Sequence, residues 1–119
     1  KLIMLTDSNC GECYDVAIHS RILSKFGLPT QNPQIINSQS TNGKKLIAKY
    51  KIKLLPTIIL TGDVKSYPTL TKIWPKIGTI EKNGAYIFRE GVKRMGTYMD
   101  LTANKIIKPV KPANNSTAN

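Results

Sequence analysis

Hydrophobic residues along the chain occur in short runs whose spacing switches between that of strands and that of helices. The apolar run in residues 1–6 predicts a buried strand. From Val16 to Phe26 the apolar positions fall on one broad arc of a helical wheel, which predicts an amphipathic helix. Gly27 is well placed to end this helix, and Pro29 prevents its continuation.

The same alternation continues through the middle of the chain. Residues 34–37 form a short candidate strand, and residues 44–50 form a short candidate helix. The β-branched run 57–60 predicts a further strand, and Pro56 stands at its start, where a missing N–H does little harm. Strands that alternate with helices favour parallel pairing through crossover connections.

The second half of the chain indicates antiparallel pairing instead. Asn83-Gly84 between two apolar segments is a strong hairpin signal. Pro68 and Pro75 limit any helix in residues 64–74 to about two turns. We expect residues 98–101 to dock on the sheet. The sequence therefore predicts an α/β fold with a mixed central β-sheet flanked by helices and a C-terminal β-hairpin extension.

Length and composition define the domain and its partners. A chain of 119 residues favours one domain, which we place in residues 1–107, and Pro, Lys, Asn, Ser and Thr predict a disordered polar tail in residues 108–119. No apolar run is long enough to cross a bilayer. The net charge of +11 indicates either an acidic partner or a soluble basic surface. Without a nucleic-acid motif, we expect no nucleic-acid partner.

Five lysines gather in the segment that leads to Pro56. They are Lys44, Lys45, Lys49, Lys51 and Lys53. Such a group either steers acidic substrates or forms a solvated helix face.

The two cysteines of the chain, Cys10 and Cys13, lie between the first strand and the amphipathic helix. A Cys-x-x-Cys pair in this position is typical of a redox-active dithiol. We expect Cys10 to be exposed at the helix N-terminus, where free N–H groups and the helix dipole stabilise a thiolate. Cys10 would then attack and Cys13 would resolve, while Gly11 would allow a substrate backbone to approach closely.

Two acidic residues near the cysteine pair disfavour the Cys10 thiolate. The carboxylates of Asp7 and Glu12 favour the thiol over the thiolate at Cys10. A less stabilised thiolate makes a dithiol more reducing, so we expect a reductant.

Other interpretations of the pair remain open, namely a structural disulfide, half of a zinc site, or two reduced buried cysteines. A structural disulfide closing so small a loop would stabilise little. A zinc site normally needs four ligands, whereas His19 is the only histidine, so we expect no metal site of this kind. Thiolates also suit Cu(I), which leaves a soft-metal-handling module as an alternative. The second alternative function is that of a redox-silent peptide-binding domain. We expect His19 and Trp74 to pack in the core.

Residues 48–60 resemble the segment that carries the cis-proline in thioredoxins. A basic-Tyr-x-Ile stretch, here 49–52, leads into a hydrophobic-Pro-Thr sequence and a buried strand, with the cysteine pair about forty residues upstream. Together with the first strand and the cysteine pair, the resemblance covers roughly residues 2–62, about half of the chain. It implies a thioredoxin-like fold and thiol–disulfide exchange with protein substrates, without an organic cofactor. It also implies that Pro56 is cis and lies beside the dithiol, and that the Leu55 backbone pairs with a substrate peptide.

The chain also departs from the pattern of that family. Asn9 stands where the family usually has Trp, and Gly11-Glu12 lacks the usual Pro between the cysteines. Met4 occupies the place of a buried acid that serves many thioredoxins as a proton acceptor. We therefore expect a divergent, monomeric member that depends on an upstream redox partner. Lys1 already lies in a strand pattern without an initiator Met. This start, the lone redox pair and the polar tail favour an extracytoplasmic domain over a cytoplasmic one, with a possible membrane tether outside the chain.

Overall fold

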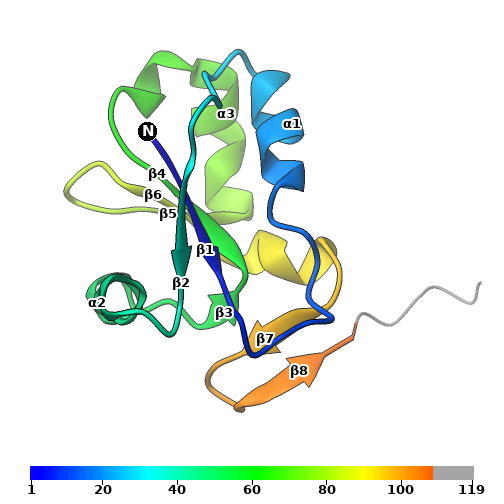
Figure 1. Ribbon diagram of the computed structural model, residues 1–119. Coiled ribbons are helices and arrows are strands. Elements are labelled where there is room, and N and C mark those ends of the chain that lie inside the picture. The colour runs from blue at the N-terminus through cyan, green and yellow to red at the C-terminus, as the bar shows by residue number, and fades with distance from the viewer. Residues whose placement is uncertain (109–119) are drawn as a thin grey trace, which may run out of the picture.

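The computed structural model describes residues 1–108, and these form a mixed α/β fold with two β-sheets and three α-helices (Figure 1). The strands are β1 (Leu2–Thr6), β2 (Gln34–Asn37), β3 (Leu54–Leu55), β4 (Thr57–Leu60), β5 (Gly78–Ile80), β6 (Tyr86–Phe88), β7 (Tyr98–Asp100) and β8 (Lys105–Ile107). The helices are α1 (Ile18–Ser24), α2 (Thr41–Tyr50) and α3 (Pro68–Ile73), with 3₁₀ turns η1 (Val64–Ser66), η2 (Trp74–Lys76) and η3 (Glu90–Arg94). Among the helices of this described part, none is long and apolar enough to cross a membrane.

The central sheet is mixed, as the sequence predicts. Its strand order is β2-β1-β4-β6-β5, in which β1 and β2 are parallel and the other neighbours are antiparallel. Met4 lies at its centre, opposite Ile35 on one side and Ile58 on the other. The predicted hairpin is formed by β5 and β6, and it completes this sheet rather than extending beyond it.

Helices cover both faces of the central sheet. Side chains of a strand alternate between its faces, so neighbouring residues of β4 enter different clusters. Ile58 packs with α1 and α3 on one face, and Ile59 packs with α2 on the other. Trp74 is only 1% exposed and packs against Tyr86 and Phe88, which confirms its place in the core.

A second sheet was not expected from the sequence. Strand β7 pairs antiparallel with β3 on one side and with β8 on the other, whereas we expected residues 98–101 to dock on the central sheet. The carboxylate of Asp100 accepts hydrogen bonds from the N–H groups of Thr102 (2.9 Å) and Ala103 (3.2 Å), which fixes the turn to β8. Short strands held by such a turn leave no long alternating pattern in the sequence.

The hairpin between β5 and β6 has a longer turn than its Asn-Gly signal alone indicates. The Gly84 N–H donates to the Glu81 carbonyl oxygen (2.9 Å), and the Glu81 N–H donates to that of Ala85 (2.8 Å). Gly84 has a φ of +89°, in the left-handed region, while Asn83 does not. This is a turn followed by a glycine bulge, a common form of the three-residue hairpin connection.

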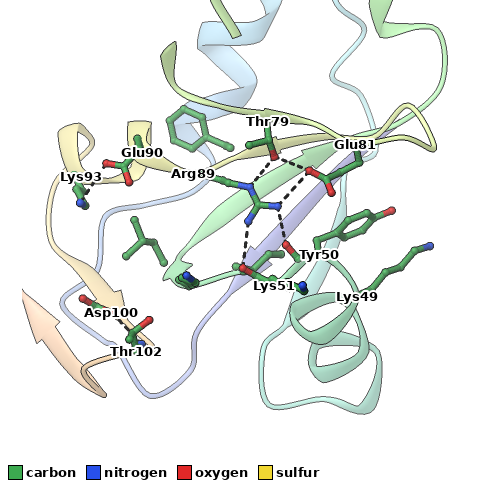
Figure 2. A pocket seen from close by; sticks show the side chains of 14 residues that line it. Lys49, Tyr50, Lys51, Thr79, Glu81, Arg89, Glu90, Lys93, Asp100 and Thr102 are labelled. Carbon is green, nitrogen blue, oxygen red and sulfur yellow. Dashed lines mark hydrogen bonds and ion pairs between the residues drawn. The ribbon is translucent and has the colours of Figure 1, made fainter. Parts of the chain in front are cut away.

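Arg89 joins the hairpin to the end of α2 (Figure 2). Its guanidinium group donates to the carbonyl oxygens of Tyr50 (2.7 Å) and Lys51 (3.3 Å) and pairs with Glu81 at 3.4 Å. The last carbonyls of a helix have no partner within the helix, so this contact satisfies two acceptors at once. Of the predicted tail, only Lys108 belongs to the part of the chain that the structure describes.

Candidate functional site

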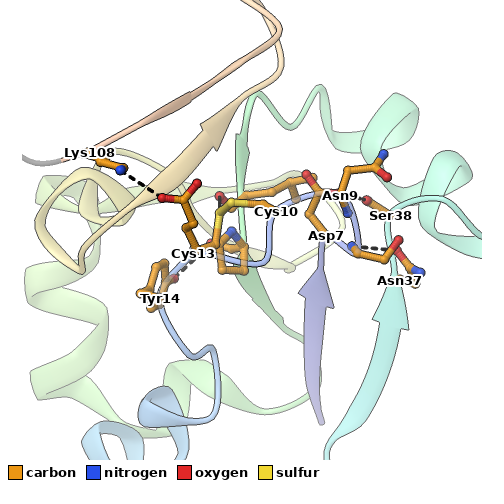
Figure 3. Close-up of a disulfide and its surroundings, with 12 residues drawn as sticks. Asp7, Asn9, Cys10, Cys13, Tyr14, Asn37, Ser38 and Lys108 are labelled. Carbon is orange, nitrogen blue, oxygen red and sulfur yellow. Dashed lines mark hydrogen bonds and ion pairs between the residues drawn. A yellow bond between two sulfur atoms is a disulfide. The ribbon is translucent and has the colours of Figure 1, made fainter.

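The two cysteines form a disulfide in the loop between β1 and α1 (Figure 3). The Cα atoms of Cys10 and Cys13 are 5.4 Å apart. The Cys10 N–H donates to the Asp7 carbonyl oxygen (3.0 Å), and the Cys13 N–H donates to that of Cys10 (3.3 Å). The pair is therefore held by two consecutive turns that follow directly on the first strand.

The prediction that Cys10 lies at a helix N-terminus is wrong. Helix α1 begins only at Ile18, and the side chain of its N-cap residue, Ala17, accepts no hydrogen bond from the first turn of the helix. The reason lies in a long-range contact, because the Tyr14 N–H donates to the Thr97 carbonyl oxygen (2.9 Å). The backbone after the dithiol is thus tied to the segment before β7, and α1 begins only five residues after Cys13.

The prediction of an exposed Cys10 is also wrong. Cys10 is 6% exposed, whereas Cys13 is half-buried, so the order of accessibility is the reverse of the expected one. Because the pair lies in turns, its first side chain does not project outward from the first turn of a helix. Gly11 is exposed between them, and a Cβ atom added there would have no neighbour within 4 Å.

The structure places the Pro56 segment beside the disulfide. The Leu55–Pro56 peptide bond is cis, and the sulfur of Cys13 lies 3.9 Å from the carbonyl oxygen of Leu55. A disulfide sulfur carries no hydrogen, so this is a packing contact; on reduction the Cys13 thiol could donate to the same oxygen. Three of the residues singled out from the sequence therefore meet at one place.

The backbone edge of Leu55 is already paired with another strand of the same chain. Leu55 lies directly opposite Met99 in the antiparallel register of β3 and β7. In that ladder the Leu101 N–H donates to the Lys53 carbonyl oxygen (2.8 Å). Hydrogen-bonded pairs recur at every second residue of an antiparallel ladder, so Leu55 and Met99 exchange both of their backbone hydrogen bonds. Strand β7 thus occupies the edge at which we expected a substrate peptide.

Tyr14 takes part in the site, although its place next to Cys13 is the one signal in the sequence that points to it. Its hydroxyl group donates to the Pro56 carbonyl oxygen (2.9 Å) and lies 2.8 Å from Nε2 of His19. A tyrosine hydroxyl has one hydrogen, so Nε2 of His19 must donate to the Tyr14 oxygen. The three groups form one chain of hydrogen bonds that ends on the backbone beside the dithiol.

Burial decides the protonation states of this hydrogen-bonded chain. It lowers the pKa of His19 to about 4 and raises the pKa of Tyr14 well above its usual value, so both side chains are neutral near pH 7. His19 is 3% exposed and packs edge-on against Phe88, with ring centroids 4.7 Å apart. The prediction that His19 packs in the core is confirmed, and its ring is also hydrogen-bonded.

The two acidic residues near the pair are engaged with other groups. The buried carboxylate of Asp7 accepts hydrogen bonds from the Asn9 N–H (3.0 Å) and the Ser38 hydroxyl (3.3 Å). The exposed carboxylate of Glu12 lies 3.0 Å from Nζ of Lys108. Asp7 thus fixes the loop to the end of β2, and Lys108 offsets the charge of Glu12.

The site offers few ligands for a metal ion. In residues 1–108 no group of three or more His, Cys, Asp and Glu side chains is placed to hold one. Reduction of the disulfide would supply two thiolates, the donor type that soft ions prefer.

The class of protein rests on its own geometry, since no family model, curated protein or solved structure matches the chain. The chain is a mixed α/β protein with a Cys-x-x-Cys disulfide in the loop after its first strand. That loop contacts a cis-proline segment at the start of β4. These features are compatible with a redox function.

Proposed function

We propose that this protein is a thiol–disulfide oxidoreductase of the thioredoxin-like class that exchanges its cysteine pair with protein substrates. The observation that carries the proposal is the Cys10–Cys13 disulfide packed against the carbonyl group of Leu55, 42 residues from Cys13. A disulfide that closes so short a loop contributes little to the stability of the fold. A role in redox chemistry therefore explains the Cys10–Cys13 disulfide better than a stabilising role does.

The order of the elements supports the thioredoxin-like class. The cysteine pair follows β1, which is parallel to β2 and antiparallel to β4, and the cis proline immediately precedes β4. Helices cover both faces of the sheet. The late start of α1 and the second sheet are departures from the expected arrangement, and both lie next to the dithiol.

The exchange reaction moves two electrons in two displacement steps. In the reducing direction a thiolate of the pair attacks a substrate disulfide, and one substrate sulfur leaves as a thiolate that takes up a proton. The second cysteine then attacks the mixed disulfide, which releases the other substrate thiolate and closes the Cys10–Cys13 bond. An upstream dithiol partner regenerates the pair by the reverse steps, and its thiolate reaches the half-buried Cys13 more readily than Cys10.

The surroundings of the sulfurs favour a reductant over an oxidant. A strongly oxidising dithiol stabilises its reduced form, for example by placing the thiolate at a helix N-terminus. Here α1 begins after Ala17, so its first N–H groups are remote from Cys10 along the chain. The buried position of Cys10 also disfavours an uncompensated negative charge.

The reduction potential tests the proposal directly. The chain is equilibrated with glutathione buffers, free thiols are alkylated, and the oxidised fraction is read by mass spectrometry. We expect a reversible two-electron couple nearer to about −270 mV than to about −120 mV. The variant Cys10→Ser, with Cys13 as its only thiol, serves as the control: it can form a mixed disulfide with glutathione, seen as added mass, but no intramolecular disulfide. Absence of a reversible couple in the wild-type chain would refute the oxidoreductase proposal.

A further inference from the structure

A cleft of about 750 Å³ lies apart from the cysteine pair, between the C-terminal end of α2, the β5–β6 hairpin, η3 and the turn after β7 (Figure 2). Binding sites for small ligands and short chain segments commonly occupy roughly 300–1,000 Å³. Neither Cys10 nor Cys13 lines this cleft. The size of the cleft and its distinct lining therefore indicate a binding function separate from that of the cysteine pair.

The acidic side chains of the cleft are already engaged. Glu81 pairs with Arg89 at 3.4 Å, and Glu90 pairs with Lys93 at 3.2 Å. The carboxylate of Asp100 accepts hydrogen bonds from the N–H groups of Thr102 and Ala103, which fix the turn to β8. Glu81 and Glu90 are thus paired with cations, and the Asp100 carboxylate is hydrogen-bonded to backbone N–H groups.

Three further lysines of the cleft carry positive charge that no carboxylate in residues 1–108 pairs with. Lys49, Lys51 and Lys53 line the cleft from the end of α2 and the segment that follows it. All three are exposed, and none forms an ion pair with any residue in 1–108. Nζ of Lys49 lies 5.2 Å from the ring centre of Tyr50, which holds this cation near the helix end.

The wall of the cleft also contains apolar side chains. An anionic ligand that has an apolar part therefore fits the cleft better than a purely polar anion. Ile52, Leu54 and Phe88 contribute to its wall. Its aromatic residues, Tyr50 and Phe88, are only 7% and 6% exposed, so they present no open ring face on which a nucleic-acid base could stack. A row of cations beside aliphatic side chains suits an extended peptide with carboxylates and an apolar residue.

We propose that the cleft docks an extended acidic segment of a protein partner. Its carboxylates would face Lys49, Lys51 and Lys53, and an aliphatic side chain would contact Leu54. The net charge of +11 would attract such a partner at long range, and the cleft would give the local contact. Leu54 lines the cleft, and the next residue, Leu55, touches the sulfur of Cys13. If the proposed redox function holds, a partner bound here is kept close to the disulfide.

Binding of an acidic peptide without cysteine tests this site separately from the redox reaction. The probe is a fluorescently labelled ten-residue peptide of Glu and Asp around a central Leu, titrated by anisotropy at low ionic strength. The test variant is Lys49→Gln/Lys51→Gln/Lys53→Gln. The matched control is Lys65→Gln/Lys72→Gln/Lys76→Gln, which removes the same charge from exposed lysines outside the cleft. Circular dichroism checks that each variant keeps the wild-type fold.

We expect the cleft variant to bind the peptide about tenfold more weakly, because three rim charges each contribute a factor of about two to three. The control should change the affinity less than twofold, and affinity should fall between about 0.01 M and 0.15 M salt. Equal weakening by the two triple variants would mean attraction by bulk charge only and would overturn the proposal. Tighter binding of oligo-dT with the same number of charges would also overturn it, in favour of a nucleic-acid site. Since the peptide has no thiol, neither result bears on the reduction potential.

Discussion

The sulfur of Cys13 lies 3.9 Å from the carbonyl oxygen of Leu55, and the two residues that follow these, Tyr14 and Pro56, are joined by a hydrogen bond of 2.9 Å. Two consecutive residues of the dithiol loop therefore contact two consecutive residues at the start of β4. Such a double contact fixes the distance between the loop and the strand, and the Tyr14 hydroxyl supplies its hydrogen bond.

Replacing Tyr14 with phenylalanine should lower the free energy of unfolding by about 1–3 kcal/mol. The change leaves the Pro56 carbonyl oxygen and the Nε2–H group of His19 without their partner in a buried place. Urea unfolding of the oxidised protein measures the effect. Tyr67→Phe is the matched control, since the Tyr67 hydroxyl forms no hydrogen bond with residues 1–108, and its effect should stay within about 0.5 kcal/mol. Equal losses in the two variants would contradict the role given to Tyr14.

His19 should make the protein less stable as the pH falls below neutral. Its pKa is about 4 in the folded state and about 6.5 in the unfolded chain, so the unfolded state binds the proton first. The stabilisation is complete above about pH 6.5 and is lost progressively as the pH falls towards 4. The full difference is about 3 kcal/mol.

The variant His19→Gln isolates this contribution, because a glutamine amide can still donate to Tyr14 but does not titrate. Unfolding free energies are measured from pH 7.5 to pH 4 for both proteins. The wild type should lose about 3 kcal/mol more than the variant over this range. Parallel curves would show that His19 does not resist protonation in the fold.

Gly43 should not tolerate even a methyl group. A Cβ atom at this position in α2 would overlap the backbone carbonyl group of Asn37, which cannot move away as a side-chain tip can. We expect Gly43→Ala to lower the free energy of unfolding by about 1–3 kcal/mol despite the higher helix propensity of alanine. Gly11→Ala is the control, since a Cβ atom there meets open space, and it should be neutral in the same thermal or urea unfolding measurement. A neutral Gly43→Ala would show that α2 shifts freely against β2.

Local pattern was sufficient for most strands of the central sheet and for its mixed pairing, whereas the order of the strands was not predicted. The apolar runs that form β1 and β4, and the Asn83-Gly84 turn, are signals contained within a few residues. The proximity of Cys13 to Pro56 followed from the resemblance of residues 48–60 to the thioredoxin segment, and not from spacing alone.

The errors around the dithiol have a different cause. The hydrogen bond from Tyr14 to Thr97 and the pairing of Leu55 with Met99 join residues that are far apart in the sequence. The helical periodicity of the sequence could not reveal that the backbone before Ile18 is bonded to Thr97 instead of forming the first turn of the helix. Strands β7 and β8 have three residues each, too few for a strand pattern to be recognised. Tertiary contacts thus overrode the local preference at the site itself.

Strand β7 should limit access to the disulfide, and a proline at Met99 should relieve that limit. Proline removes the N–H group that pairs with the Leu55 carbonyl oxygen, whereas Met99→Ala keeps it and serves as the matched control. We expect dithiothreitol to reduce Cys10–Cys13 several-fold faster in Met99→Pro than in Met99→Ala. The rate is followed by timed alkylation and mass spectrometry, with circular dichroism to verify that the central sheet persists. Equal rates in the two variants would mean that the buried state of Cys10 arises from its own turns rather than from the covering strand.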